Sequence, residues 1–219
     1  MTTIVKSVVG ALLALLGLVL TVTGAWFATQ LGSSGTAEFT ARPATSDPVL
    51  IRPVVLNRVD ADVVVTATPA PGATVWMALA NPSDAAAVMG DSRHVEATGV
   101  EVRDWVLQTR TIGAGEAPAL GAADLWRQQD SAEGPVTLTV QQDEAPETLV
   151  IATEGGELET LTLTVVDKTW FVEAVVAVLA GLFLLLAGGA LLWPRRGEAD
   201  VSAEDGAPNV EPVTEEVTR

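Results

Sequence analysis

The stretch SVVGALLALLGLVLTVTGAWFAT, residues 7–29, carries no charged residue and decides the fold. It belongs to an uncharged run that ends at Ala37, and a second such stretch, AVVAVLAGLFLLLAGGALLW, occupies residues 174–193. About 20 apolar helical residues cross the hydrocarbon core of a bilayer, and a backbone in lipid must satisfy its own hydrogen bonds. The sequence therefore predicts two transmembrane α-helices, over residues 7–29 and 170–193.

Basic residues beside the two stretches predict how the chain is oriented. Lys6 precedes the first stretch, and Arg195 and Arg196 follow the second. Positively charged flanks stay on the cytoplasmic side of a membrane. We therefore expect a multi-pass plasma membrane protein with both terminal segments, residues 1–6 and 194–219, in the cytoplasm.

A cleavable signal peptide is the alternative for the first stretch, with Thr23-Gly24-Ala25 as a small-x-small cleavage site. The apolar region, however, continues through Trp26 and Phe27, past the roughly 7 to 15 residues of an ordinary signal core. A mature N-terminus near Trp26 would leave only one span.

Small residues mark one face of the first helix, because they recur at alternating spacings of three and four. The second stretch offers a similar line. Since lipid gives helices no hydrophobic reason to associate, close approach along small residues is the usual means. The predicted helix-packing interface comprises Gly10, Ala14, Gly17, Thr21, Gly24, Ala177, Gly181 and Gly188. Its partner is either the other helix of this chain or another membrane protein.

Glu173 directly precedes the second uncharged stretch and lies one turn into the predicted helix over residues 170–193. Ionisable groups inside a membrane are costly. Glu173 therefore either lies at head-group depth or turns toward the first span. In the second case it forms a polar interface and accepts a hydrogen bond from Gln30 or from a partner subunit.

Residues 30–169 form the predicted extracytoplasmic domain. The whole chain has no Cys, one His and a net charge of -16, and this domain alone has 20 acidic and 8 basic residues. The absence of Cys excludes disulfides, so a hydrophobic core must stabilise the domain. The acidic balance disfavours binding to nucleic acid or to anionic lipid head groups.

Short β-branched runs separated by turn residues predict an all-β domain, a β-sandwich of about 8–10 strands between the two helices. The predicted strands cover residues 37–41, 50–56, 62–68, 74–80, 94–98, 105–112, 124–128, 135–140, 148–153 and 158–166. Residues 160–165 alternate so that Leu161, Leu163 and Val165 share one face. Residues 154–157, Glu-Gly-Gly-Glu, predict a tight hairpin, and residues 82–89 predict a short helix that Gly90 ends.

No constellation in the sequence indicates catalysis. His94 is the only imidazole, and its neighbour Ser92 is not part of a Gly-x-Ser-x-Gly elbow. A catalytic triad also needs a base that lies between the nucleophile and the acidic residue that orients the base. We therefore expect a protein that is not an enzyme, with no catalytic, metal or cofactor site.

Five runs, at residues 75–80, 84–89, 124–126, 136–140 and 148–153, resemble in their order a group of uncharacterised actinobacterial membrane proteins with two terminal transmembrane helices. The resemblance implies their layout: an N-terminal span, an extracytoplasmic β-rich domain, and a C-terminal span with a short basic flank. It implies no activity.

Two functions remain open. The first is a non-enzymatic, membrane-anchored interaction module in the bilayer, such as an accessory subunit of a cell-envelope or respiratory complex, with other membrane proteins as partners. The alternative is a protein that binds or senses an envelope ligand and reports through its acidic cytoplasmic tail. That tail is predicted to be disordered, with Thr214 or Thr218 as phosphorylation targets.

Overall fold

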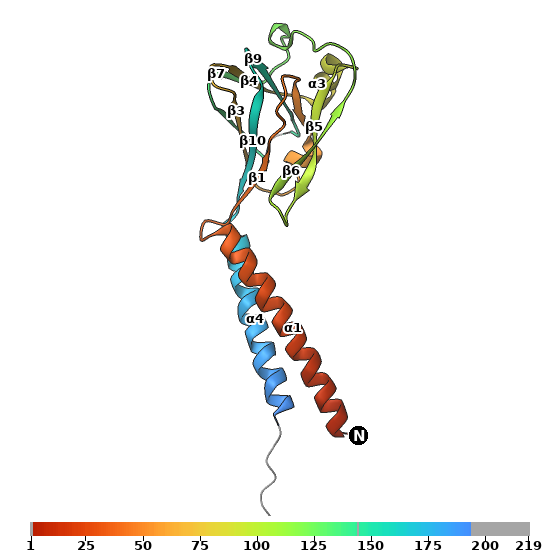
Figure 1. Cartoon of the computed structure of the whole chain (residues 1–219), viewed down its shortest axis with the longest axis vertical. Coiled ribbons are helices and arrows are strands. Elements are labelled where there is room, and N and C mark those ends of the chain that lie inside the picture. The colour runs from red at the N-terminus through yellow and green to blue at the C-terminus, as the bar shows by residue number, and fades with distance from the viewer. Residues whose placement is uncertain (1, 144, 194–219) are drawn as a thin grey trace, which may run out of the picture.

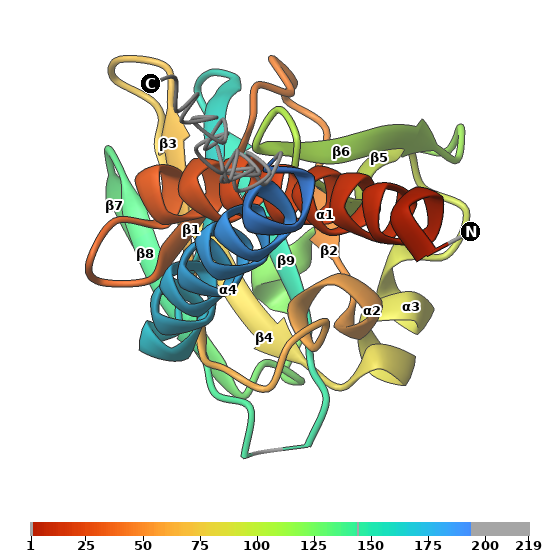
Figure 2. The same ribbon diagram turned by 90° about the horizontal axis from the view of Figure 1, so that it is seen from below.

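The computed structural model describes residues 2–143 and 145–193, so the tail with Thr214 and Thr218 lies outside the described residues. Two long helices, α1 (Thr2–Leu31) and α4 (Lys168–Leu192), pack together below a β domain (Figure 1). Both are long and apolar enough to cross a membrane. Seen from below, they cross beneath the β domain (Figure 2). The two predicted helices are therefore present.

The β domain is a ten-stranded sheet in the order β7-β4-β9-β2-β5-β6-β1-β10-β3-β8. Among the strand pairs of the described residues, β2–β5 and β1–β6 are parallel and the others are antiparallel, and the β1–β6 ladder contains a single residue pair, Thr40 with Val106. The strands are β1 (Thr36–Ala41), β2 (Val49–Ile51), β3 (Val63–Pro69), β4 (Thr74–Ala80), β5 (His94–Glu101), β6 (Val106–Ile112), β7 (Gln128–Glu133), β8 (Val136–Val140), β9 (Thr148–Glu154) and β10 (Leu158–Val166).

The sheet is barrel-like, so the predicted β-sandwich is wrong. The sheet curls until strands from opposite ends of its order share one core, in which Met77 of β4 packs in the same buried cluster as Leu138 of β8. The predicted alternation of β10 is confirmed, because Leu161, Leu163 and Val165 are all buried in this cluster. A curled sheet buries one face around a single core, whereas a sandwich needs two separate sheets.

The predicted hairpin at residues 154–157 is also wrong. Gly155 does adopt a positive φ of 80°, as a tight turn requires. The strands on either side of it nevertheless pair with other strands. β9 pairs with β2 and β4, and β10 pairs with β1 and β3.

Two predicted strands differ most in their boundaries from those of the structure. In the run 50–56 the strand ends at Ile51, and α2 (Pro53–Leu56) follows because proline suits the first position of a helix. In the run 124–128 only the last residue is in a strand, since β7 begins at Gln128 and is exposed along its whole length.

Helix α3 (Pro82–Met89) confirms the predicted short helix, and Gly90 follows it with a φ of 48°. The helix covers the outer face of the sheet. There Met89 packs with Leu50 and Val150 in a second, smaller hydrophobic cluster. A short 3₁₀ helix, η1 (Leu120–Ala122), places Leu120 in the same cluster.

A clasp between two chain segments joins the helix pair to the β domain. The Asp167 N–H donates to the Gly35 carbonyl at 3.0 Å, and the Asp167 carboxylate caps α4 by accepting from the Thr169 N–H at 2.8 Å. Gly35 has a φ of 67°, and a Cβ at this position would collide with the Asp167 carbonyl. Both ends of the β domain therefore meet at one point above the helices.

Candidate functional site

The predicted helix-packing residues meet each other in a seam between α1 and α4, defined by Gly10, Gly17 and Gly24 facing Gly188, Gly181 and Ala174. The backbones touch there. A Cβ added to Gly17 would lie 2.6 Å from the Gly181 carbonyl oxygen, and one added to Gly188 would lie 2.6 Å from the Ala14 nitrogen. The small face of α1 is thus occupied by the other helix of the same chain.

Thr21 and Ala177 have different roles from the glycines. The Thr21 hydroxyl donates to the Gly17 carbonyl at 2.7 Å, and a Cβ on Gly181 would meet that same hydroxyl. Ala177 is only partly buried and lines a cavity next to the seam. The seam is therefore closed along α1, but it gives way to open space at its domain end.

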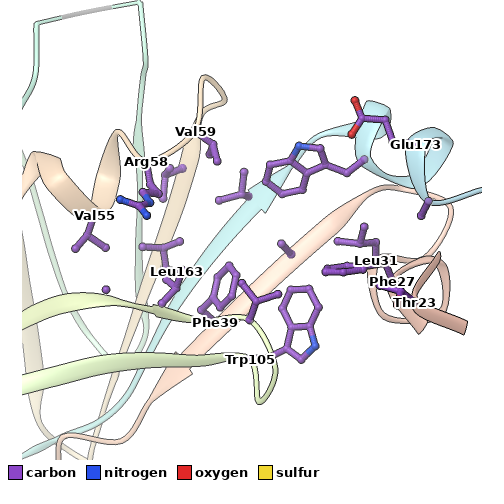
Figure 3. Close-up of a pocket in the computed structure, with 18 of the residues that line it drawn as sticks. Thr23, Phe27, Leu31, Phe39, Val55, Arg58, Val59, Trp105, Leu163 and Glu173 are labelled. Atoms are coloured by element: carbon purple, nitrogen blue, oxygen red, sulfur yellow. The ribbon is translucent and has the colours of Figure 1, made fainter. Parts of the chain in front are cut away.

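That space is a cavity of about 690 Å³ between the domain-side halves of the two helices and the lower end of the barrel. Its walls come from five separated parts of the chain, residues 20–31, 37–39, 54–63, 98–105 and 163–177. Figure 3 shows Val55, Arg58 and Val59 on one side, and Phe39 and Trp105 on the other. The volume is within the usual range of sites for small organic ligands, about 300–1,000 Å³.

The cavity lining is almost entirely apolar. Apart from Thr23, Thr98, Arg58 and Glu173, its side chains are aliphatic or aromatic, and the remaining positions are glycines. Among the described residues that line the cavity, Arg58 is the only cation and Glu173 the only anion. Such a surface favours an apolar ligand, with polar recognition restricted to a few points.

An aromatic group forms the wall between α1 and the β5–β6 turn. The Trp105 ring lies 5.2 Å from the Phe39 ring and 6.1 Å from the Trp26 ring, measured between centroids. Trp105 adopts a φ of 55°, a region that L residues rarely occupy. Its indole N–H is buried and has no hydrogen-bond partner among the described residues. Contacts between aromatic rings thus build this wall.

The opposite wall is fixed by Gln142, which follows β8. Its side chain accepts from the Asn57 amide at 2.6 Å and donates to the Leu56 carbonyl at 3.1 Å. Its backbone N–H donates to the Asp62 carboxylate at 3.0 Å. These contacts hold the end of α2 and the loop after it, so the position of Arg58 in that loop is set by a residue far along the chain.

Glu173 is exposed and lines the same cavity. Within residues 2–143 and 145–193 its side chain makes no hydrogen bond or ion pair, and the predicted bond from Gln30 does not form. The predicted polar interface at Glu173 stays a prediction. The structure gives Glu173 a neighbour that the sequence did not indicate, the cavity.

The polar residues around His94 lie elsewhere, on the outer face of the sheet beside a smaller cavity of about 230 Å³. The His94 Nδ1–H donates to the Ser92 backbone carbonyl at 2.7 Å, and not to the Ser92 hydroxyl. Glu96, two residues further on, pairs with Arg52 at 2.8 Å. His94 and Ser92 therefore do not form a nucleophile and base pair in this structure.

The sequence did not indicate the cavity, because each of its wall segments looks like ordinary strand, turn or helix. The one available signal was the aromatic residues Trp26, Phe27 and Trp105, which the prediction placed in the first helix and in a strand. No protein-family model matches this chain, and no curated protein matches it either.

Proposed function

We propose that this chain is a two-pass membrane protein whose extracytoplasmic domain binds the acyl chain of a membrane lipid. The observation that carries the proposal is the 690 Å³ apolar cavity, whose walls belong both to the long apolar helices and to the barrel. Of the two functions that the sequence left open, we therefore favour ligand binding over the interaction module. The interaction module relied on a free small-residue face, and that face is occupied by α4.

The surface of the helix pair supports its place in a bilayer. Because small residues form the seam, the large apolar side chains point outward, with Phe183 71% and Leu186 75% exposed. The hydrophobic effect makes such a continuous apolar surface unfavourable in water, and lipid tails cover it without cost. Lys6, Arg195 and Arg196 support an orientation with both termini in the cytoplasm.

The depth of the cavity supports a lipid as its occupant. Leu20 and Ala177 line it, and each lies roughly 15 Å along its helix from the domain-side end, at 1.5 Å per residue. The head-group layer of one leaflet is only about 5–8 Å thick. One end of the cavity therefore lies at hydrocarbon depth and the other inside the barrel, so an acyl chain can enter sideways without crossing water.

The cavity would be unfavourable without an apolar occupant. Each methylene removed from water contributes about 0.8 kcal/mol. The barrel end, walled by Phe39, Val63 and Leu163, presents only apolar atoms to whatever fills it. An acyl chain supplies the contacts that those side chains lack.

A tryptophan introduced into the cavity tests the proposal. Val59 and Val64 are both partly buried, but only Val59 lines the cavity, while Val64 lies on β3 next to the inward-facing Val63 and points to the opposite face. We expect Val59→Trp to reduce the lipid retained after detergent purification to less than about a third of the wild-type amount, and Val64→Trp to leave it unchanged. Native mass spectrometry of the full chain measures both. Equal retention in the two variants, or no lipid on the wild type, would refute lipid binding in this cavity.

A further inference from the structure

An acyl chain alone does not explain why one lipid should occupy this cavity in preference to another. The tails of different lipids are equally apolar, so filling the cavity with a tail gives no selectivity between lipid classes. A preference for one class of lipid must come from a polar contact outside the tail. The cavity lining offers one cation for that purpose, Arg58.

We infer that Arg58 binds the phosphate of a phospholipid whose acyl chain occupies the cavity, an inference that rests on the proposed function. The Arg58 side chain is exposed and lines the cavity, which suits a phosphate at the mouth and a tail inside. A guanidinium presents a planar set of donors that binds phosphate oxygens in pairs.

Arg58 differs from most arginines of the domain in its partners. Four others, Arg52, Arg93, Arg110 and Arg127, each pair with a carboxylate. Among the described residues Arg58 has no such partner, although the domain has 20 acidic residues against 8 basic ones. The carboxylate of Asp62, four positions further on, accepts from the Gln142 backbone N–H. In an acidic domain an unpaired arginine beside an apolar cavity retains its donors for a ligand.

The loop that carries Arg58 is held in place, as a binding residue requires. Gln142 contacts Asn57 immediately before it and the carbonyl of Leu56 at the end of α2. Binding a phosphate here therefore costs little ordering of the backbone. Because the domain is strongly acidic overall, recognition depends on this contact and not on a long-range positive field, which ionic strength would screen beyond about 8 Å.

The experiment compares phospholipid with a lipid that lacks the phosphate. The full chain is placed in detergent micelles with equal amounts of phosphatidylethanolamine and diacylglycerol of identical acyl chains, and retained lipid is identified by native mass spectrometry. We expect about fivefold enrichment of the phospholipid on the wild type, consistent with one arginine contact near a membrane surface. Arg58→Gln should abolish the enrichment while the total amount of lipid stays the same.

Arg103→Gln is the matched control. Arg103 is also exposed and lies beside Trp26 and Phe27, but it does not line the large cavity, so its loss should leave the enrichment intact. The inference is overturned if the wild type shows no enrichment, if Arg58→Gln keeps it, or if Arg103→Gln loses it equally. A wild type that retains no lipid of either kind, or a Val59→Trp variant that retains as much as the wild type, would instead refute the proposed function itself.

Discussion

The seam between α1 and α4 and the cavity beside it are both apolar, yet one is closed and the other is hollow. In the seam, Gly17 and Gly181 bring backbone atoms of the two helices into contact. At the cavity, Phe39, Trp105 and Trp170 line a space of about 690 Å³. Small side chains let whole helices approach, whereas large rigid ones hold the segments behind them apart. Hydrophobicity therefore does not determine whether a region is filled. The size of the side chains, and the segments of the chain from which they come, determine it.

The largest expected effect comes from enlarging a residue of the seam. In Gly17→Leu the new Cβ would lie 2.5 Å from the Leu185 nitrogen, and backbone atoms cannot move aside as a flexible side chain does. We expect a loss of more than about 3 kcal/mol in the free energy of unfolding, because the two helices must separate.

Gly189→Leu is the control for that substitution. Gly189 lies on α4, and a Cβ there meets nothing within 4 Å. Thermal unfolding in detergent should show a marked decrease for Gly17→Leu and little change for Gly189→Leu. Equal melting temperatures would mean that the seam is not closed as the structure describes.

A smaller difference is expected at the turn between the seam and the β domain. Gly32 and Gly35 have φ values of 60° and 67°, so alanine is strained at either position. A Cβ on Gly32 meets open space, while one on Gly35 collides with the Asp167 carbonyl. We expect Gly32→Ala to cost about 1 kcal/mol and Gly35→Ala about 2 kcal/mol more. Chemical denaturation of both variants in the same detergent measures the difference, and similar values for the two would contradict the clasp at Asp167.

The smallest effect compares two leucines of one strand. Leu161 and Leu163 both point inward from β10 and are 0% and 2% exposed, but only Leu163 lines the cavity. Leu161→Ala should cost about 3 kcal/mol and Leu163→Ala about 1 kcal/mol less, because Leu163 already lacks neighbours on one side. The measurement is denaturant unfolding after lipid removal. A larger loss for Leu163→Ala would show that its surroundings are filled.

The sequence was sufficient for the helices and for most strands, because their signals are local. Apolar length predicts α1 and α4, and alternation predicts β10. Local signals also predicted α3, since Pro82 and Gly90 mark its two ends. The reliance on local signals also explains why the strand predicted over residues 124–128 lies too early in the chain relative to β7. Its sequence Gln-Gln-Asp-Ser-Ala-Glu has no alternation, and the apolar Leu125 and Trp126 that precede it pack on the outer cluster instead.

Strand pairing and the cavity were beyond the sequence because both depend on distant contacts. The turn at Gly155 has the conformation of a hairpin turn. No local signal shows that β9 pairs with β2 and β4, while β10 pairs with β1 and β3. The position of Arg58 depends similarly on Gln142, a residue 84 positions away whose side chain has no recognisable motif around it. The helix seam was predictable because its glycine spacing lies within single helices.

Because Thr36 pairs with Val166, the two ends of the β domain lie side by side, as in a domain that can be inserted into or deleted from a chain. These residues are opposite each other in an antiparallel ladder, so the chain enters and leaves the domain within about 5 Å. If the β domain were deleted, a short loop from Leu31 to Lys168 would connect α1 and α4 in a helical hairpin. Residues 36–166 could likewise be inserted between neighbouring positions of another protein. The β domain is thus connected to the helix pair at one place, where the chain enters and leaves it.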